Sequence, residues 1–163
     1  ASSNLTERFT RCVEAAGPVT HVVRIKGDSP FVDPAVIDAA VQLALTTGAA
    51  YASNRVRRSY PKGLEVEVVT AAALSSSTAQ ADPQVAATTS PLAQIRAQPD
   101  RYSQAHCLAP RDLSGLDWRV KTPADYAFVK AVYAALHTAD PGFSMQDVLD
   151  IMQGRQDLAR WAA

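Results

Sequence analysis

The stretch Arg24-Ile25-Lys26-Gly27-Asp28-Ser29-Pro30 decides the fold, because a short apolar run ends in it and a carboxylate follows directly. Residues 20–26 read as a buried strand that glycine and proline terminate. Asp28 is therefore expected at the carboxyl end of a strand, where an open α/β sheet has its ligand crevice. A carboxylate in that place can hold a divalent metal on a triphosphate, so the stretch predicts a ligand site.

Helix and strand patterns alternate on both sides of this stretch, which predicts an α/β fold with a mostly parallel sheet and flanking helices. Further strands are expected at 50–53, 65–69, 102–108 and 118–121. Helices are expected at 4–16, from 34 to Gly48, weakly at 70–79, and after Ser90-Pro91, Thr122-Pro123 and Ser144. The chain shows no opening strand followed by a glycine-rich or basic phosphate loop, with which doubly wound nucleotide-binding domains normally begin.

Composition narrows the function classes. The 163 residues suffice for one domain, expected over 1–163. Sixteen basic and sixteen acidic residues balance, so no basic field is available for nucleic acid or for a membrane surface. No apolar run could span a bilayer and no secretory signal is seen, which favours a cytoplasmic protein. Cys12 and Cys107 are expected to be two buried thiols rather than a disulfide.

Five short segments follow one another in a telling order: Leu5-Thr6-Glu7-Arg8-Phe9, Arg24 to Pro30, Tyr51-Ala52-Ser53-Asn54, Tyr60 to Glu67, and Trp118 to Asp125. Together they resemble motifs of the spore-coat polysaccharide cytidylyltransferases, relatives of the CMP-sugar synthetases. The resemblance implies a nucleotide-diphospho-sugar transferase-like (Rossmann-like) fold that lacks the usual first strand and phosphate loop. This chain would correspond to the C-terminal two thirds of that fold.

The resemblance also implies an activity, namely transfer of CMP from CTP to an acidic sugar in glycan or polysaccharide biosynthesis. A sugar hydroxyl would attack the α-phosphorus and pyrophosphate would leave, with magnesium neutralising charge. It implies a homodimer as well. By resemblance, Asp28 is the metal ligand, Arg24 and Gly27 bind the nucleotide, and the substrate-binding residues are Asn54, Tyr60, Gly63, Glu65 and Glu67.

Several of these residues have a structural interpretation of equal simplicity. Asp28 can cap the turn at Ser29-Pro30, and Asn54 at a strand end is a common turn former. Glu67 can be a solvated carboxylate, because charged and apolar residues alternate over 65–69 as in a half-exposed strand. Asp125 fits a capping box with Thr122. The three histidines, His21, His106 and His137, are expected to be structural, with satisfied ring nitrogens.

Three departures from the family pattern count against activity. The nucleotide loop has no counterpart, and Ala86 to Ser90 replace a charged family segment. Lys121 stands where the family has a second metal-binding aspartate, and a protonated lysine cannot coordinate a metal. The alternative is a degenerate, non-catalytic relative that acts as a binding or assembly module. A third hypothesis, an unrelated α/β protein with chance matches, would place 22–26 and 117–121 outside one sheet. The first two hypotheses expect Asp28 and Lys121 to project into a shared pocket.

Overall fold

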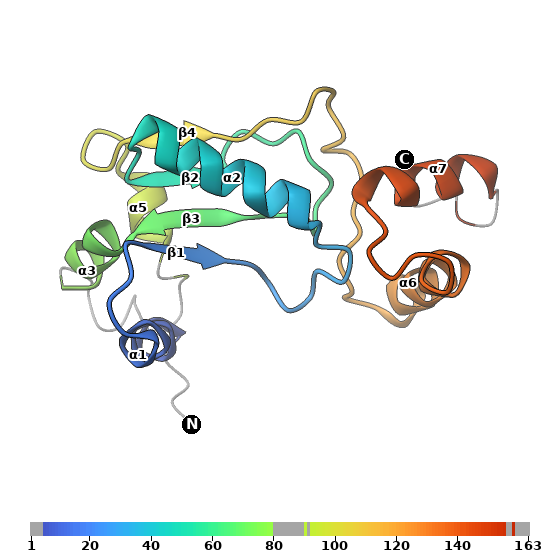
Figure 1. Cartoon of the computed structure of the whole chain (residues 1–163), viewed down its shortest axis with the longest axis horizontal. Coiled ribbons are helices and arrows are strands. Elements are labelled where there is room, and N and C mark those ends of the chain that lie inside the picture. The colour runs from blue at the N-terminus through green and yellow to red at the C-terminus, as the bar shows by residue number, and fades with distance from the viewer. Residues whose placement is uncertain (1–4, 80–89, 91, 156–157, 159–163) are drawn as a thin grey trace.

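The computed structural model describes residues 5–79, 90, 92–155 and 158, and in these it has helices packed around one open sheet (Figure 1). The strands are β1 (His21–Arg24), β2 (Tyr51–Ser53), β3 (Glu67–Thr70) and β4 (Gln104–His106). The helices are α1 (Leu5–Ala16), α2 (Pro34–Thr47), α3 (Ala71–Ala79), α5 (Ala93–Ala97), α6 (Pro123–Leu136) and α7 (Met145–Gly154). None of these helices is both long and apolar enough to cross a membrane.

The sheet has the strand order β1-β3-β2-β4. Strands β1 and β2 each pair antiparallel with β3, whereas β2 pairs parallel with β4. Three strands therefore run in one direction and β3 alone is reversed. The α/β class is confirmed, but the expected parallel character is only partial, since one of the three pairings is parallel. The crossover through α2 returns the chain in the same direction and leaves a space between β1 and β2, which β3 fills.

Helices cover both faces of the sheet. In Figure 1 α2 lies across one face, while α1 and α3 lie on the other side. Ala40 and Ala44 of α2 share a core with Ala52 and Val68. A second core, on the opposite face, contains Tyr51, Val69, Ala73, Leu74, Leu92, Ile95 and Tyr102. Because β3 is central and covered on both sides, residues 65–69 are all buried, and the prediction of a half-exposed strand is wrong.

The helices α6 and α7 lie together at one end of the sheet (Figure 1). Phe31, which follows β1, packs edge-on against Trp118 and Phe128 with ring centroids 5.9 and 5.7 Å apart. The Asp33 carboxylate accepts hydrogen bonds from the amides of Ala35 (2.8 Å) and Met145 (2.7 Å). Asp33 therefore caps α2, as predicted, and also holds the start of α7.

The segment Trp118–Lys121 is irregular, so the strand expected there is wrong. Beside it, the isolated bridge between Lys62 and Asp117 pairs this part of the chain with the lead-in to β3. The Asp117 carboxylate accepts from the Arg119 amide at 3.2 Å, which turns the chain away from a longer pairing. The helix starts after it were predicted correctly, because Thr122 with Asp125 forms a capping box and so does Ser144 with Asp147.

The two cysteines differ in their burial. Cys107 is buried, but Cys12 is exposed on α1, so the expectation of two buried thiols is wrong for Cys12. That residue lies on the outward side of an amphipathic helix, where water replaces the core. Asn4, expected to cap the first helix, and Ala86 to Thr89, aligned with the charged family segment, lie outside the described residues.

Candidate functional site

A row of polar residues crosses the sheet where β1, β2 and β4 end. Arg24 is the register partner of Glu67, Glu67 of Ser53, and Ser53 of His106. Cross-strand partners point to the same face, and here it is the face of Tyr51, two residues before Ser53. Since ligands of open α/β sheets bind at the carboxyl ends of strands, this row is the floor of the candidate site.

Glu67 is the centre of this row and is only 1% exposed. Its carboxylate forms ion pairs with Arg24 and Arg96, the latter at 2.5 Å between Nη1 and Oε1. The Tyr51 hydroxyl donates to Oε1 at 2.7 Å. Burial, followed by the charge of Glu67, raises the pKa of Tyr51, so the phenol stays protonated and keeps donating. The interpretation of Glu67 as a solvated carboxylate is therefore wrong. Arg96 on α5 also pairs with Glu67, and the sequence analysis did not name it as a site residue.

Glu65 and Gly63 form a second internal arrangement just before β3. The Glu65 carboxylate accepts from the Gly63 amide at 2.9 Å and from Arg58 at 3.1 Å. Burial raises the pKa of Glu65, but these hydrogen bonds outweigh it and hold the pKa below its usual range. Gly63 has φ 105°, and a Cβ there would lie 3.2 Å from the Trp118 carbonyl carbon. Glu65 and Gly63 thus shape the turn that seats residues 117–119.

Asn54 and Tyr60, both predicted to bind substrate, lie on the connection between β2 and β3. The Asn54 amide donates to the Leu64 carbonyl at 2.7 Å and accepts from the Val66 amide at 2.8 Å, so it holds this connection closed. The Tyr60 hydroxyl lies 3.9 Å from the Cys107 sulfur, and burial together with that thiol raises the pKa of Tyr60 to about 12. Asn54 is buried and both polar atoms of its side chain form hydrogen bonds within the protein, whereas Tyr60 is half-buried.

Asp28 lies beside the segment that carries Lys121, because the Val120 amide donates to the Asp28 carbonyl at 3.1 Å. The Asp28 carboxylate is half-buried and accepts from the Ser29 hydroxyl at 3.3 Å, which fits its interpretation as a turn residue. The Lys121 ammonium donates instead to Asp117 at 3.2 Å. Gly27 has open space where a Cβ would be. The two backbones are thus adjacent, but Lys121 is directed to Asp117.

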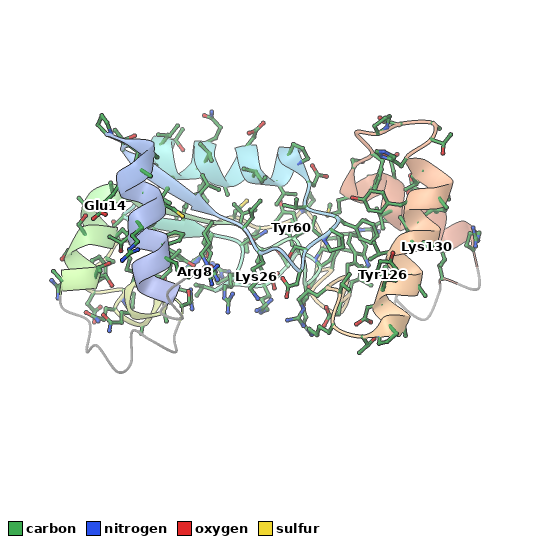
Figure 2. All side chains as sticks on the ribbon, turned by 90° about the horizontal axis from the view of Figure 1, so that it is seen from below. Arg8, Glu14, Lys26, Tyr60, Tyr126 and Lys130 are labelled. Atoms are coloured by element: carbon green, nitrogen blue, oxygen red, sulfur yellow. The ribbon has the colours of Figure 1, made fainter. Side chains whose placement is uncertain are left out.

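Asp117 is the centre of a second cluster, at the rim of the site. Arg119 approaches it with two nitrogens, Nε at 2.8 Å from Oδ1 and Nη2 on Oδ2. These hydrogen bonds hold the pKa of Asp117 well below its usual range. Figure 2 shows Lys26 and Tyr60 in the middle of the molecule, between the sheet and α6, on which Tyr126 and Lys130 lie.

A magnesium ion held by Asp28 and residue 121 does not fit these side chains. Hard divalent cations need several oxygen ligands, and position 121 supplies an ammonium that is itself paired with Asp117. Within the described ranges, no three His, Cys, Asp or Glu side chains gather as a metal site would require. Of the two carboxylates expected to hold the metal, the residues present therefore provide one, that of Asp28.

His106 departs from the expectation of a satisfied structural histidine. Its Nδ1 atom is buried and has no hydrogen-bond partner among the residues that the structure describes. His106 ends the polar row on β4, at the same level as Ser53. A buried nitrogen without a partner is costly unless water or a ligand satisfies it. This atom therefore belongs with the floor of the site.

Comparisons with known proteins agree with this architecture. A family model described as "Cytidylyltransferase" matches residues 2–149. The spore coat polysaccharide biosynthesis protein SpsF of Bacillus subtilis (strain 168) is 27% identical over 164 residues, which cover 98% of this chain and 65% of that protein. A solved cytidylyltransferase structure from Leptospira borgpetersenii serovar Hardjo-bovis (strain JB197) superposes with a TM-score of 0.86.

That structural match has 18% sequence identity and covers 97% of this chain and 66% of the solved chain, so it shows the shared fold. The chain spans about two thirds of the length of both relatives. The match over residues 2–149 also removes the hypothesis of chance motif matches in an unrelated α/β protein.

Proposed function

Since the chain belongs to the cytidylyltransferase family, we propose that it serves the transfer of CMP from CTP to an acidic sugar in polysaccharide biosynthesis. A sugar hydroxyl attacks the α-phosphorus, the new P–O bond forms, and the bond to the bridging oxygen breaks to release pyrophosphate. The product is a CMP-sugar. The cytoplasm, where CTP is made, is the proposed compartment, and a homodimer is the proposed assembly.

The polar row at the carboxyl ends of β1, β2 and β4 is the observation that carries this proposal. Little covalent chemistry is needed from the protein in such a transfer, which must orient the two substrates and balance their charge. Lys26 and Arg119 supply positive charge near Asp28 and Glu65, as the electrostatic influence of these groups on one another indicates. In this proposal Lys26 and Arg119 bind the phosphate oxygens, and the polar row binds the sugar.

The test is a pyrophosphate-release assay with the native protein, CTP and a panel of acidic sugars, each paired with its neutral analogue. Pyrophosphate that appears only with an acidic sugar supports the proposal. Lys26→Gln is expected to lower the rate at least about tenfold, because it removes one of the two cations assigned to the phosphate oxygens. Lys130→Gln, at an exposed lysine on α6, is the matched control and should retain the rate. No pyrophosphate with any sugar would overturn the proposal.

A second measurement asks what Lys121 does to metal affinity. Calorimetric titration of magnesium in the presence of CTP should give the same affinity with the native protein and with Lys121→Met if position 121 is not a ligand site. Lys121→Asp restores the carboxylate that the family has there. Tighter magnesium binding in Lys121→Asp alone would indicate that the natural chain has moved away from a two-carboxylate metal site.

A further inference from the structure

The cluster around Glu67 carries more positive than negative charge. One carboxylate faces two guanidinium groups, and the Tyr51 phenol is neutral because its pKa is raised. The side chains of Arg24 and Arg96 are each 17% exposed, whereas that of Glu67 is 2% exposed. One positive charge is therefore left over in a largely desolvated place. An unmatched charge there is costly, and a bound anion would remove the cost.

Both arginines have donors to spare. A guanidinium has five N–H groups. The structure gives Arg24 and Arg96 one hydrogen bond each, through Nη1, and both of these go to Glu67. No other acceptor for them is found within the described ranges. The carboxylate of Glu67 thus fixes the two side chains in place and leaves their remaining N–H groups for another acceptor.

A second observation comes from the opposite end of the same row. The buried Nδ1 of His106 has no partner among the described residues. The α5 helix is held above this part of the sheet, since the Gln104 side chain donates to the carbonyls of Ile95 and Arg96 at 3.1 Å. Gln104 and His106 are two residues apart on β4 and so share a face. An unsatisfied nitrogen and a surplus charge therefore lie on one sheet face beneath α5.

We propose that Arg24 and Arg96 form a binding site for one carboxylate of the sugar substrate, and that His106 Nδ1, at the other end of the row, bonds a more distant oxygen of the same molecule. A planar carboxylate fits the guanidinium fork in a bidentate geometry. A single surplus charge matches a monoanion, whereas a triphosphate would need several more cations. The site deepens the proposed function and rests on it only for the identity of the ligand.

The test is direct binding, without CTP and without turnover. Glucuronate is titrated into ¹⁵N-labelled protein while the arginine Nε–Hε signals are followed by NMR, with glucose and inorganic phosphate as comparison probes. We expect the signals of Arg24 and Arg96 to shift with glucuronate and not with glucose. Binding should weaken as salt rises, because the attraction is electrostatic. Equal shifts with glucose and glucuronate, or tighter binding of phosphate, would overturn the carboxylate site.

Variants add a second arm to this experiment. Arg96→Gln makes the cluster neutral and should weaken glucuronate binding at least about tenfold. Arg57→Gln, on the exposed part of the connection after β2, is the control and should bind as the native protein does. Unchanged affinity in Arg96→Gln refutes the site. If this variant fails to fold, as circular dichroism would show, the titration of the native protein still decides.

Failure of the site and failure of the proposed function give different results. Glucuronate bound by Arg24 and Arg96, with no pyrophosphate released from any sugar, would overturn the cytidylyl transfer and leave the site standing. Pyrophosphate released at equal rates by the native protein and by Arg96→Gln would overturn the carboxylate site and leave the cytidylyl transfer standing, because the sugar would then be bound elsewhere.

Discussion

Two carboxylates in this protein are each held by two cations, but in different surroundings. Glu67 binds Arg24 and Arg96 in the middle of the sheet, and its side chain is 2% exposed. Asp117 binds Arg119 and Lys121 at the rim, and its side chain is 37% exposed. The same chemistry therefore occurs once in a desolvated place and once in contact with water.

The difference shows why an ion pair must be judged by its surroundings. At the rim, water screens the charges and each partner can be solvated if the other is lost, so the pair is weak. In the sheet, the loss of one partner leaves the others unpaired where water cannot replace it. The cluster around Glu67 should thus hold its two arginines in fixed positions. The cluster around Asp117 should contribute little to stability, because its partners are solvated on the surface.

Substitution of the inner carboxylate should have the largest effect. Glu67→Gln keeps the shape but leaves two guanidinium groups without a counter-charge, and should destabilise the protein by about 3–5 kcal/mol. Urea unfolding followed by circular dichroism measures this loss. Glu14→Gln, an exposed residue on α1 (Figure 2), is the control and should change stability little. A loss of unfolding free energy below about 1 kcal/mol in Glu67→Gln would mean that this cluster contributes no more than an exposed ion pair does.

The second largest loss of stability is expected at the contact between the turn before β3 and residues 118–119. Gly63 lies in the turn before β3, with positive φ and with the backbone of Trp118 and Arg119 close to where a Cβ would be. Gly63→Ala should cost about 1–3 kcal/mol in unfolding free energy, since backbone must move and φ is unfavourable. Gly115→Ala meets open space and provides the comparison. Equal midpoints for the two variants in thermal unfolding would contradict this reading of the turn.

The outer carboxylate should matter less and in a pH-dependent way. Asp117→Asn should destabilise by about 0.5–1 kcal/mol at pH 7, because the pair is well exposed. The pKa of Asp117 is lowered in the folded state, so its stabilisation is complete above the unfolded pKa of about 3.9. It disappears as pH falls from there through the lower folded pKa. Urea unfolding from pH 7 to pH 2 should show the native protein and the variant converging only in acid.

The smallest effect is expected for Lys121. It is half exposed, and its ammonium meets Asp117 at 3.2 Å on the surface. Lys121→Met should change unfolding stability by no more than about 0.5 kcal/mol, and added salt should remove even that. A loss that persists at high salt would mean that Lys121 contributes through packing rather than charge.

Local patterns predicted the elements well where the residues themselves define them. Proline after a capping side chain marked the starts of α2 and α6, and those caps are formed as expected. The prediction failed at Trp118–Lys121, whose apolar residues resemble a strand, because a side-chain contact of Asp117 with Arg119 turns the chain there. A pattern of apolar residues carries no information on such a contact.

The site could be predicted only in its individual residues. Arg24 and Glu67 were named separately, but their pairing depends on the register of strands whose two residues lie 43 positions apart in the sequence. Arg96 comes from a short helix far along the chain and has no local signal at all. Which charges neutralise one another is decided by long-range packing, and one sequence does not reveal it.

The reversed strand also governs the order in which the protein can assemble. On a ribosome, His21–Arg24 and Tyr51–Ser53 emerge first, yet neither has its native neighbour until Glu67–Thr70 follows. Arg96, which completes the charge cluster, is made later still. Such distant pairings slow folding and leave early segments exposed. The nascent chain therefore carries two unpaired strands until β3 is made and pairs with both, and β4 joins the free edge of β2 later still.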